Sequence, residues 1–174
     1  NGTQIDYINQ ADSNFLCSIY ILEDTCVKTN SPVYSAGISV VDVSTGKSIL
    51  HEFYTKNNDN KAFLEELIQY TESYSPSEVI VNLYNVTNLS KKDIVLNIQN
   101  RTYHFYKNNF DRNFLKLSYQ KTFFEKVYYN IFNSGLLNIF EYLDLEKKEL
   151  AKLSLLLLLD FAYKHNETII QKLD

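Results

Sequence analysis

Apolar and polar residues alternate along the first third of the chain with the two-residue period of β-strands. Between Phe15 and Glu23 both alternating sets are largely apolar, which is typical of a central strand covered on both faces. Two more strands are expected at about 33–43 and 47–55, joined by a tight turn at Ser44-Thr45-Gly46. These three strands should form an antiparallel meander.

The period becomes helical after the polar cluster at 57–60, which can cap a helix. Apolar residues from Phe63 to Tyr74 recur at three- and four-residue intervals, and Ser75-Pro76 should end that helix. The capping-box sequence Ser90-Lys91-Lys92-Asp93 begins a short helix. Two more strands are expected at 78–83 and 101–106, the second at an edge of the sheet, with the short helix at 90–99 between them. Three helices at 118–132, 137–142 and 145–165 and a final turn at 166–173 should follow.

The order of these elements predicts the fold class. A right-handed crossover from the third strand places the fourth strand beside the first and gives the sheet order 3-2-1-4-5. The expected class is α/β: a ribonuclease H-like mixed five-stranded sheet flanked by helices, with additional C-terminal helices. This topology also explains a first strand that is apolar on both faces. A fold alone does not identify a function.

Composition narrows the class of protein. The 174 residues suit one domain with a substantial core. The net charge of −4 argues against a protein that binds nucleic-acid phosphates through an overall positive charge. Two cysteines exclude a disulfide framework and a four-cysteine zinc site. The stretch 150–162 is too short to span a bilayer, so no membrane contact is expected. The chain contains no methionine, so we expect it to be a piece of a longer protein.

Nucleases of the ribonuclease H-like fold hold two divalent metals with carboxylates, so a metal-dependent nuclease of ribonuclease H-like or resolvase type is one alternative. Their pattern places acidic residues in the middle of the first strand, on the first helix and at the end of the fourth strand. The first strand has Ser18-Ile19-Tyr20 at its middle, and the segment 79–83 is also without a carboxylate. Glu65 and Glu66 remain on the helix, where a solvated face is the favoured interpretation.

A second alternative is a nucleic-acid-binding module formed by residues 101–129, where basic residues alternate with aromatic ones. Such a pattern can bind single strands by stacking and phosphate contact. We favour an amphipathic edge strand and helix that bury their aromatic rings and solvate their lysines. The basic and aromatic residues concerned are Arg101, Lys107, Arg112, Lys116, Lys121 and Lys126 with Tyr103, Phe105, Tyr106 and Phe110.

Motifs of other chemistries are missing from the sequence. There is no Gly-rich phosphate loop, Gly-x-Ser-x-Gly elbow or dinucleotide fingerprint. His51, His104 and His165 lie far apart, and none is at metal-ligand spacing with another histidine or a cysteine. We therefore assign no catalytic residue, no cofactor-binding residue and no metal ligand in this segment.

Several stretches, in order and at suitable spacing, resemble the connector domain (domain II) of MutS, the DNA mismatch-recognition ATPase. They include an asparagine-led first strand, a glycine-containing strand with an Asp-x-Ser-Thr-Gly hairpin, and a leucine-rich last helix. The stretches are Gly2-Thr3, Asn14 to Ile19, Ala36 to Lys47, Glu65 to Leu67, Ser75 to Ile80 and Ala151 to Asn166.

The resemblance implies that 1–13 is a linker from a preceding mismatch-binding domain and that 14–174 is the connector domain. In the family, this non-catalytic module relays nucleotide-dependent rearrangement between the mismatch-binding and ATPase parts and helps to recruit MutL. It implies no cofactor in this segment, and ATP and Mg in a full-length parent that is a DNA-dependent ATPase acting on mismatched DNA. An intracellular location follows from the same resemblance, with the compartment left open.

The resemblance also points to partner-binding residues. Asp160 and Lys164 lie near the end of the last long helix and are candidates for contact with a MutL-like protein. The alternative for both is an ordinary solvated helix face.

Overall fold

A computed structural model describes residues 14–96, 98–127 and 147–165. Its five strands form one mixed sheet in the order β3-β2-β1-β4-β5. β1 and β3 both pair with β2 in antiparallel fashion, and β4 pairs parallel to both β1 and β5. The predicted α/β class, meander and strand order are confirmed. The strands are β1 Phe15–Thr25, β2 Pro32–Asp42, β3 Ser48–Tyr54, β4 Glu78–Tyr84 and β5 Thr102–Lys107.

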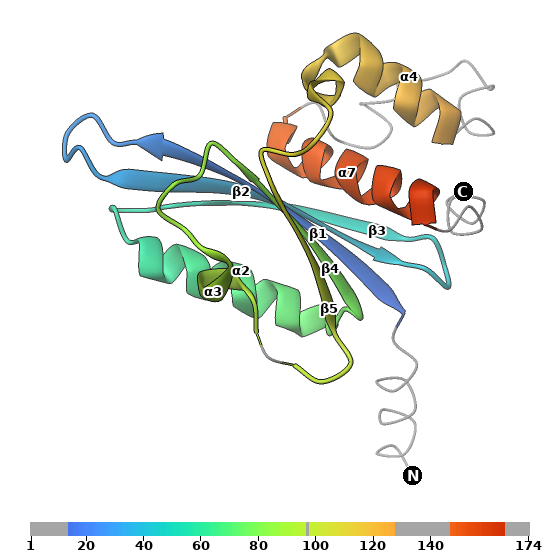
Figure 1. Cartoon of the computed structure of the whole chain (residues 1–174), viewed down its shortest axis with the longest axis horizontal. Helices are drawn as coiled ribbons and strands as arrows, with labels where there is room; N and C mark the ends of the chain where they lie inside the picture. The colour runs from blue at the N-terminus through green and yellow to red at the C-terminus, as the bar shows by residue number, and fades with distance from the viewer. Residues whose placement is uncertain (1–13, 97, 128–146, 166–174) are drawn as a thin grey trace.

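Helices cover both faces of the sheet (Figure 1). α2 and α3 lie on one face, α7 lies on the other, and α4 lies on the outer side of α7. The helices are α2 Asn60–Tyr74, α3 Lys91–Ile94, the 3-10 turn η1 Arg112–Leu115, α4 Leu117–Val127 and α7 Glu149–His165. The sheet is therefore the middle layer, and its two faces bury different sets of side chains.

Short-range polar contacts set the helix ends where the sequence predicted them. The Asp59 carboxylate accepts a hydrogen bond from the Ala62 N–H at 2.9 Å, and Ser75 adopts the left-handed conformation (φ 45°) that ends α2. The Asp93 carboxylate accepts from the Ser90 N–H at 2.7 Å, as a capping box requires. α3 nevertheless ends at Ile94 rather than near 99, because the backbone becomes extended at the next residue.

The last long helix begins later than predicted. Residues 147 and 148 are outside the helix, which begins at Glu149, so the expected start at 145 is wrong for these two residues. Glu52 of β3 explains the boundary, because its carboxylate accepts from the N–H groups of Leu150 and Ala151 at 3.0 and 3.2 Å. The expected segments 1–13, 128–132, 137–142 and 166–173 lie outside the described residues.

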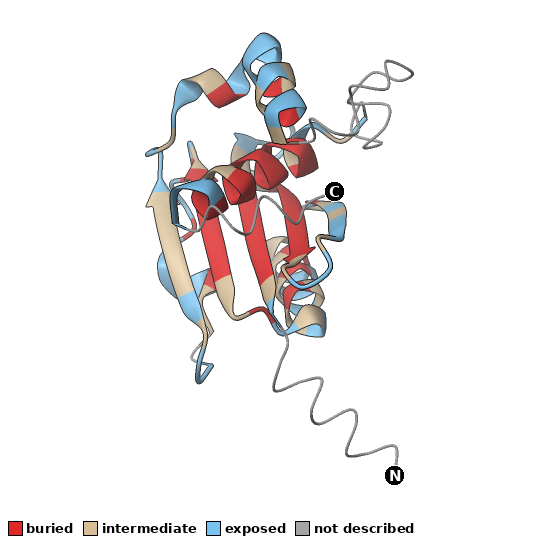
Figure 2. Ribbon diagram, turned by 90° about the vertical axis from the view of Figure 1, so that its right-hand side faces the viewer, coloured by how far each residue is buried: buried red, intermediate tan, exposed pale blue. Residues whose placement is uncertain are grey.

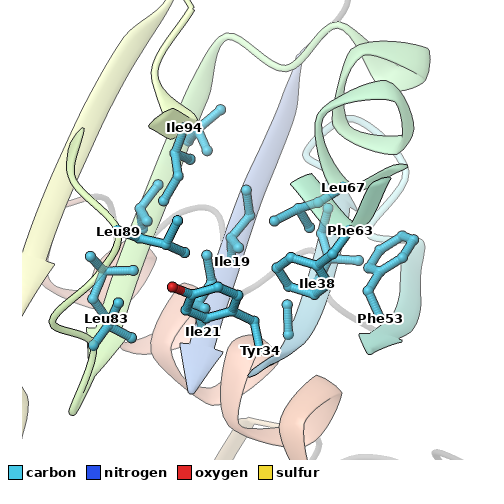
Figure 3. Close-up of a cluster of buried hydrophobic side chains, with 14 of the residues drawn as sticks. Ile19, Ile21, Tyr34, Ile38, Phe53, Phe63, Leu67, Leu83, Leu89 and Ile94 are labelled. Carbon is cyan, nitrogen blue, oxygen red and sulfur yellow. The ribbon is translucent and has the colours of Figure 1, made fainter. Parts of the chain in front are cut away.

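Both faces of the sheet carry apolar cores. On β1, Cys17, Ile19 and Ile21 face α2, whereas Leu16 and Tyr20 face α7. Figure 3 shows the α2-side cluster, in which the β1 isoleucines lie near side chains of α2. Figure 2 shows the buried residues concentrated in the central strands and along α7. The prediction that the first strand is covered on both faces is confirmed.

α7 is buried around its whole circumference from Ala151 to Leu159. It approaches the sheet so closely that the Ser154 hydroxyl donates to the Ser18 carbonyl at 2.6 Å and lies 3.0 Å from the Ser39 hydroxyl. Its apolar length is therefore explained by packing inside the domain. Within the described part of the chain, no helix combines the length and the apolarity needed to cross a bilayer.

Gly37 makes this approach possible. A Cβ atom at Gly37 would lie 2.1 Å from the carbonyl carbon and oxygen of Leu150 and 2.4 Å from the nitrogen of Ala151. These are backbone atoms of the first turn of α7, so they cannot move away as the end of a flexible side chain can.

Gly37→Ala should therefore push α7 off β2 and lower the free energy of unfolding by about 3 kcal/mol, at the upper end of typical overpacking costs. Urea denaturation of both proteins measures this difference. Ser35→Ala is the control on the same face of β2, since it adds no atom, and should change stability by less than about 0.5 kcal/mol. Equal stability of Gly37→Ala and the parent chain would contradict the close approach.

Candidate functional site

After the buried stretch 151–159, α7 reaches the surface again in its last turn. The Lys164 ammonium donates a hydrogen bond to the Asp160 carboxylate at 2.8 Å, and the two side chains are 65% and 23% exposed. This hydrogen bond raises the pKa of Lys164 despite partial desolvation, which favours an ionised pair at neutral pH. The structure thus joins the two predicted partner-binding residues on one surface.

A hollow of about 460 Å³ lies between this turn and α4. The Lys126 ammonium lies 4.7 Å from the centre of the Tyr163 ring, a cation–π contact that links the two helices. The hollow combines aromatic side chains with charged groups. Its lining residues are Tyr119, Thr122, Phe123, Lys126, Val127, Asp160, Tyr163 and Lys164.

A second cavity, of about 370 Å³, lies on the other side of the Asp160–Lys164 pair, toward the carboxyl ends of β4 and β5. Asp160 and Lys164 line this cavity as well, so the ion pair stands between two hollows. Asn82 of β4 contributes a polar side chain to this cavity although the residue is only 3% exposed. We call this second space the β4–β5 cavity.

Glu23, at the end of β1, anchors a distant loop. Its carboxylate accepts four hydrogen bonds, from the N–H and hydroxyl of Thr87 at 3.2 and 2.8 Å and from the N–H and side-chain amide of Asn88 at 3.0 and 2.8 Å. Desolvation alone would raise the pKa of Glu23, but these hydrogen bonds outweigh it and lower the pKa. This carboxylate holds the loop after β4 against β1.

The two carboxylates considered for a nuclease lie on the exposed side of α2. Glu65 and Glu66 are exposed on α2, and the Glu65 carboxylate lies 3.7 Å from the Lys61 ammonium. Ser18, at the middle of β1, is fully buried. Across residues 14–96, 98–127 and 147–165, no group of three or more His, Cys, Asp or Glu side chains is placed to hold a metal ion. The described residues therefore give the nuclease alternative no support.

Several aromatic rings of the basic and aromatic segment after residue 100 pack against the two cores, whereas most of its lysines are exposed. Arg101, whose side chain is 4% exposed, pairs with Glu72 and donates from Nε to the Pro76 carbonyl at 2.8 Å. Tyr103 and Phe105 pack against the α2-side core, and Phe110 packs against the α7-side core. The favoured interpretation, in which these rings are used for packing, is confirmed for these three residues.

The remaining reactive side chains of the sheet are also engaged in packing. Burial raises the pKa of the Cys17 thiol to about 12, which makes the thiolate unavailable at neutral pH. The His51 ring stacks on Tyr70 with centroids 5.1 Å apart, and the His104 ring lies 4.6 Å from that of Phe161. Cys17 is therefore a buried residue of the α2-side core.

Sequence reasoning missed the two hollows, the anchoring role of Glu23 and the position of Asn82. The only available signal for Asn82 was a single amide in the otherwise apolar run of β4. For Glu23, the sequence showed only a carboxylate at the end of the apolar run of β1. Its hydrogen-bond partners lie 64 and 65 positions away in the chain.

Comparison with known proteins found no matching family model. Over 191 aligned residues, the chain is 28% identical to a curated protein of Acanthamoeba polyphaga mimivirus, the "Putative DNA mismatch repair protein mutS homolog". The alignment covers 99% of this chain and 17% of that protein, so the chain spans about one sixth of its relative. The resemblance to a MutS-family protein predicted from the motifs is confirmed.

Glu23→Gln should lower the free energy of unfolding by about 1 kcal/mol at neutral pH, a value reduced for the partial exposure of the group. The pKa of Glu23 is lowered by folding, so its contribution is full above the unfolded-state pKa and is lost as pH falls through the folded-state pKa. The difference between the two proteins should therefore shrink from about pH 5 toward pH 3, measured by urea denaturation.

The matched control is Glu65→Gln, which alters an exposed carboxylate of α2 and should have little effect at any pH. A deficit of Glu23→Gln that stays constant down to pH 3 would show that the charge of Glu23 does not hold the loop.

Proposed function

We propose that this chain is the connector domain of a MutS-like DNA mismatch repair protein, which passes conformational change between mismatch-binding and ATPase parts and contributes surface for recruiting a MutL-like protein. The observation that carries the proposal is the similarity to a mutS homolog over 99% of the chain. The predicted motifs of the connector, from the asparagine-led first strand to the leucine-rich helix, agree with it.

The construction of the fold supports a rigid relay. A body that transmits motion must keep its shape while its neighbours move. Distant elements are fastened here by specific polar contacts: Glu52 joins β3 to α7, Glu23 joins β1 to the loop after β4, and Arg101 joins the start of β5 to Glu72 of α2. Together with the two apolar cores, these contacts favour movement of the domain as one unit.

The proposed parent is a DNA-dependent ATPase. In this proposal ATP, Mg and mismatched DNA bind to its other parts, and the present chain supplies no catalytic group. The sheet order and the helices on both faces agree with the expected ribonuclease H-like fold, which by itself does not identify a function.

The last turn of α7 is the proposed surface for the MutL-like partner. Its ion pair borders the aromatic hollow formed with α4. Partner surfaces often combine an apolar centre with a polar rim, because the rim excludes water from the contacts at the centre. Asp160 and Lys164 occupy such a rim, where a charge change should act on partner binding rather than on the core.

The test uses the full-length parent and three variants: Asp160→Lys, Lys164→Asp and the double swap. Each single reversal breaks the 2.8 Å pair, whereas the double swap restores a pair with its charges exchanged. If a partner reads these positions, all three variants should lose about tenfold in capture of the MutL-like protein with nucleotide and mismatched DNA present. Mismatch affinity should not change.

The matched control is the swap of Lys61 and Glu65, an exposed pair of the same spacing on α2 at the opposite face of the sheet. It should leave capture unchanged. If all three α7 variants captured the MutL-like protein as well as the parent does, Asp160 and Lys164 would not belong to the partner surface. If capture recovered in the double swap alone, the pair would have only a local structural role.

A further inference from the structure

Asn82, which lines the β4–β5 cavity, has a side-chain hydrogen-bond donor without a partner. The residue is 3% exposed, and its side-chain nitrogen Nδ2 is buried without a hydrogen-bond partner. In the sheet it lies between Tyr20 of β1 and Tyr106 of β5. A buried donor without an acceptor destabilises a fold, so a molecule that brings an acceptor to this nitrogen gains a strong contact.

The cavity has the place and size of a small-molecule site. It lies at the carboxyl ends of β4 and β5, which run parallel to β1, and this edge is where open α/β sheets bind ligands. Its volume of about 370 Å³ is within the range of small-ligand pockets. Rings from β5, the following loop, η1 and α7 line it: Tyr106, Phe110, Phe114 and Phe161. Aromatic walls of this kind favour a flat ligand, because such rings stack on other rings.

Charges at the cavity favour an uncharged ligand. The Lys164 ammonium is already paired with Asp160 at 2.8 Å, and Asp111 adds a second carboxylate to the lining. The Nδ1 atom of His165 lies 2.8 Å from the Phe161 carbonyl, and its ring stacks on that of Phe161 with centroids 4.0 Å apart. A phosphate would meet two carboxylates and one ammonium that is already neutralised, which disfavours anions.

We propose that the β4–β5 cavity binds a small, uncharged, planar molecule with a carbonyl or ring-nitrogen acceptor, and that the Asn82 amide recognises this acceptor. The proposal is independent of the connector role, because it rests on the cavity, the unpaired amide and the aromatic walls of this chain.

Uracil is the probe, because it is planar, uncharged and carries carbonyl acceptors, and indole is the control, because it is planar but offers only an N–H donor. At about ten times its dissociation constant, uracil should raise the melting temperature of the chain by about 3–6 °C. In ¹H–¹⁵N spectra, uracil should shift the side-chain amide resonances of Asn82, and indole should not.

Asn82→Leu keeps the side-chain size and removes the donor. Since it eliminates an unpaired buried amide, it should fold with an unchanged or higher melting temperature without ligand, and its affinity for uracil should fall at least about tenfold. If this variant does not fold, the shift of the Asn82 amide in the parent chain decides the question. Asn109→Leu, a change at an exposed residue of the same cavity, should retain the uracil response.

Three results would overturn the proposed recognition by Asn82, and a fourth would overturn the proposed charge of the ligand. The first is the absence of any uracil-dependent shift of the Asn82 side-chain amide resonances at about 20 mM uracil. The second is equal uracil affinity in the parent chain and Asn82→Leu. The third is indole binding as tight as that of uracil, which would make the cavity a plain apolar hollow. Tighter binding of uridine monophosphate than of uridine would overturn the preference for an uncharged ligand.

Discussion

The packing of α7 against the sheet is the constraint on which the rest of the structure depends. The helix is joined to strands far earlier in the chain, with Ser154 lying 136 positions from Ser18 and 115 from Ser39. Gly37 has no Cβ atom that would overlap the first turn of α7. The Glu52 carboxylate accepts hydrogen bonds from the N–H groups of the same turn. One apolar helix thereby covers β1, β2 and β3 on one face of the sheet.

The placement of α7 also determines where the domain offers a surface. Residues 151–159 are buried, and the helix is exposed again in its last turn, where Asp160 and Lys164 lie between two hollows. The hollow shared with α4 suits the proposed partner contact, and the β4–β5 cavity suits a small ligand. A ligand that filled this cavity would contact the same ion pair from the other side, which gives a physical route for coupling the two.

Three charged residues of the described segments connect elements that are distant in the sequence. Glu23 holds the loop after β4, Glu52 holds the start of α7, and Arg101 pairs with Glu72 across α2 and β5. The side chains of Glu23, Glu52 and Arg101 thus form hydrogen bonds and an ion pair that hold elements of the fold together. This pattern agrees with the proposed role of a body that transmits movement, because such a body must resist deformation.

By itself, the sequence determined the strands, the main helix boundaries at Asp59 and Ser75, and the sheet order. Alternation, helical spacing, caps and turns are local properties, and the handedness of crossovers follows from strand twist. The position of Asp160 and Lys164 near the end of the last long helix was likewise predicted. Only the tertiary structure decided that Asn82 borders a cavity, that Glu23 holds a loop 64 residues away and that α7 begins at Glu149. These features arise from contacts between residues far apart in the chain, and no local pattern encodes such contacts.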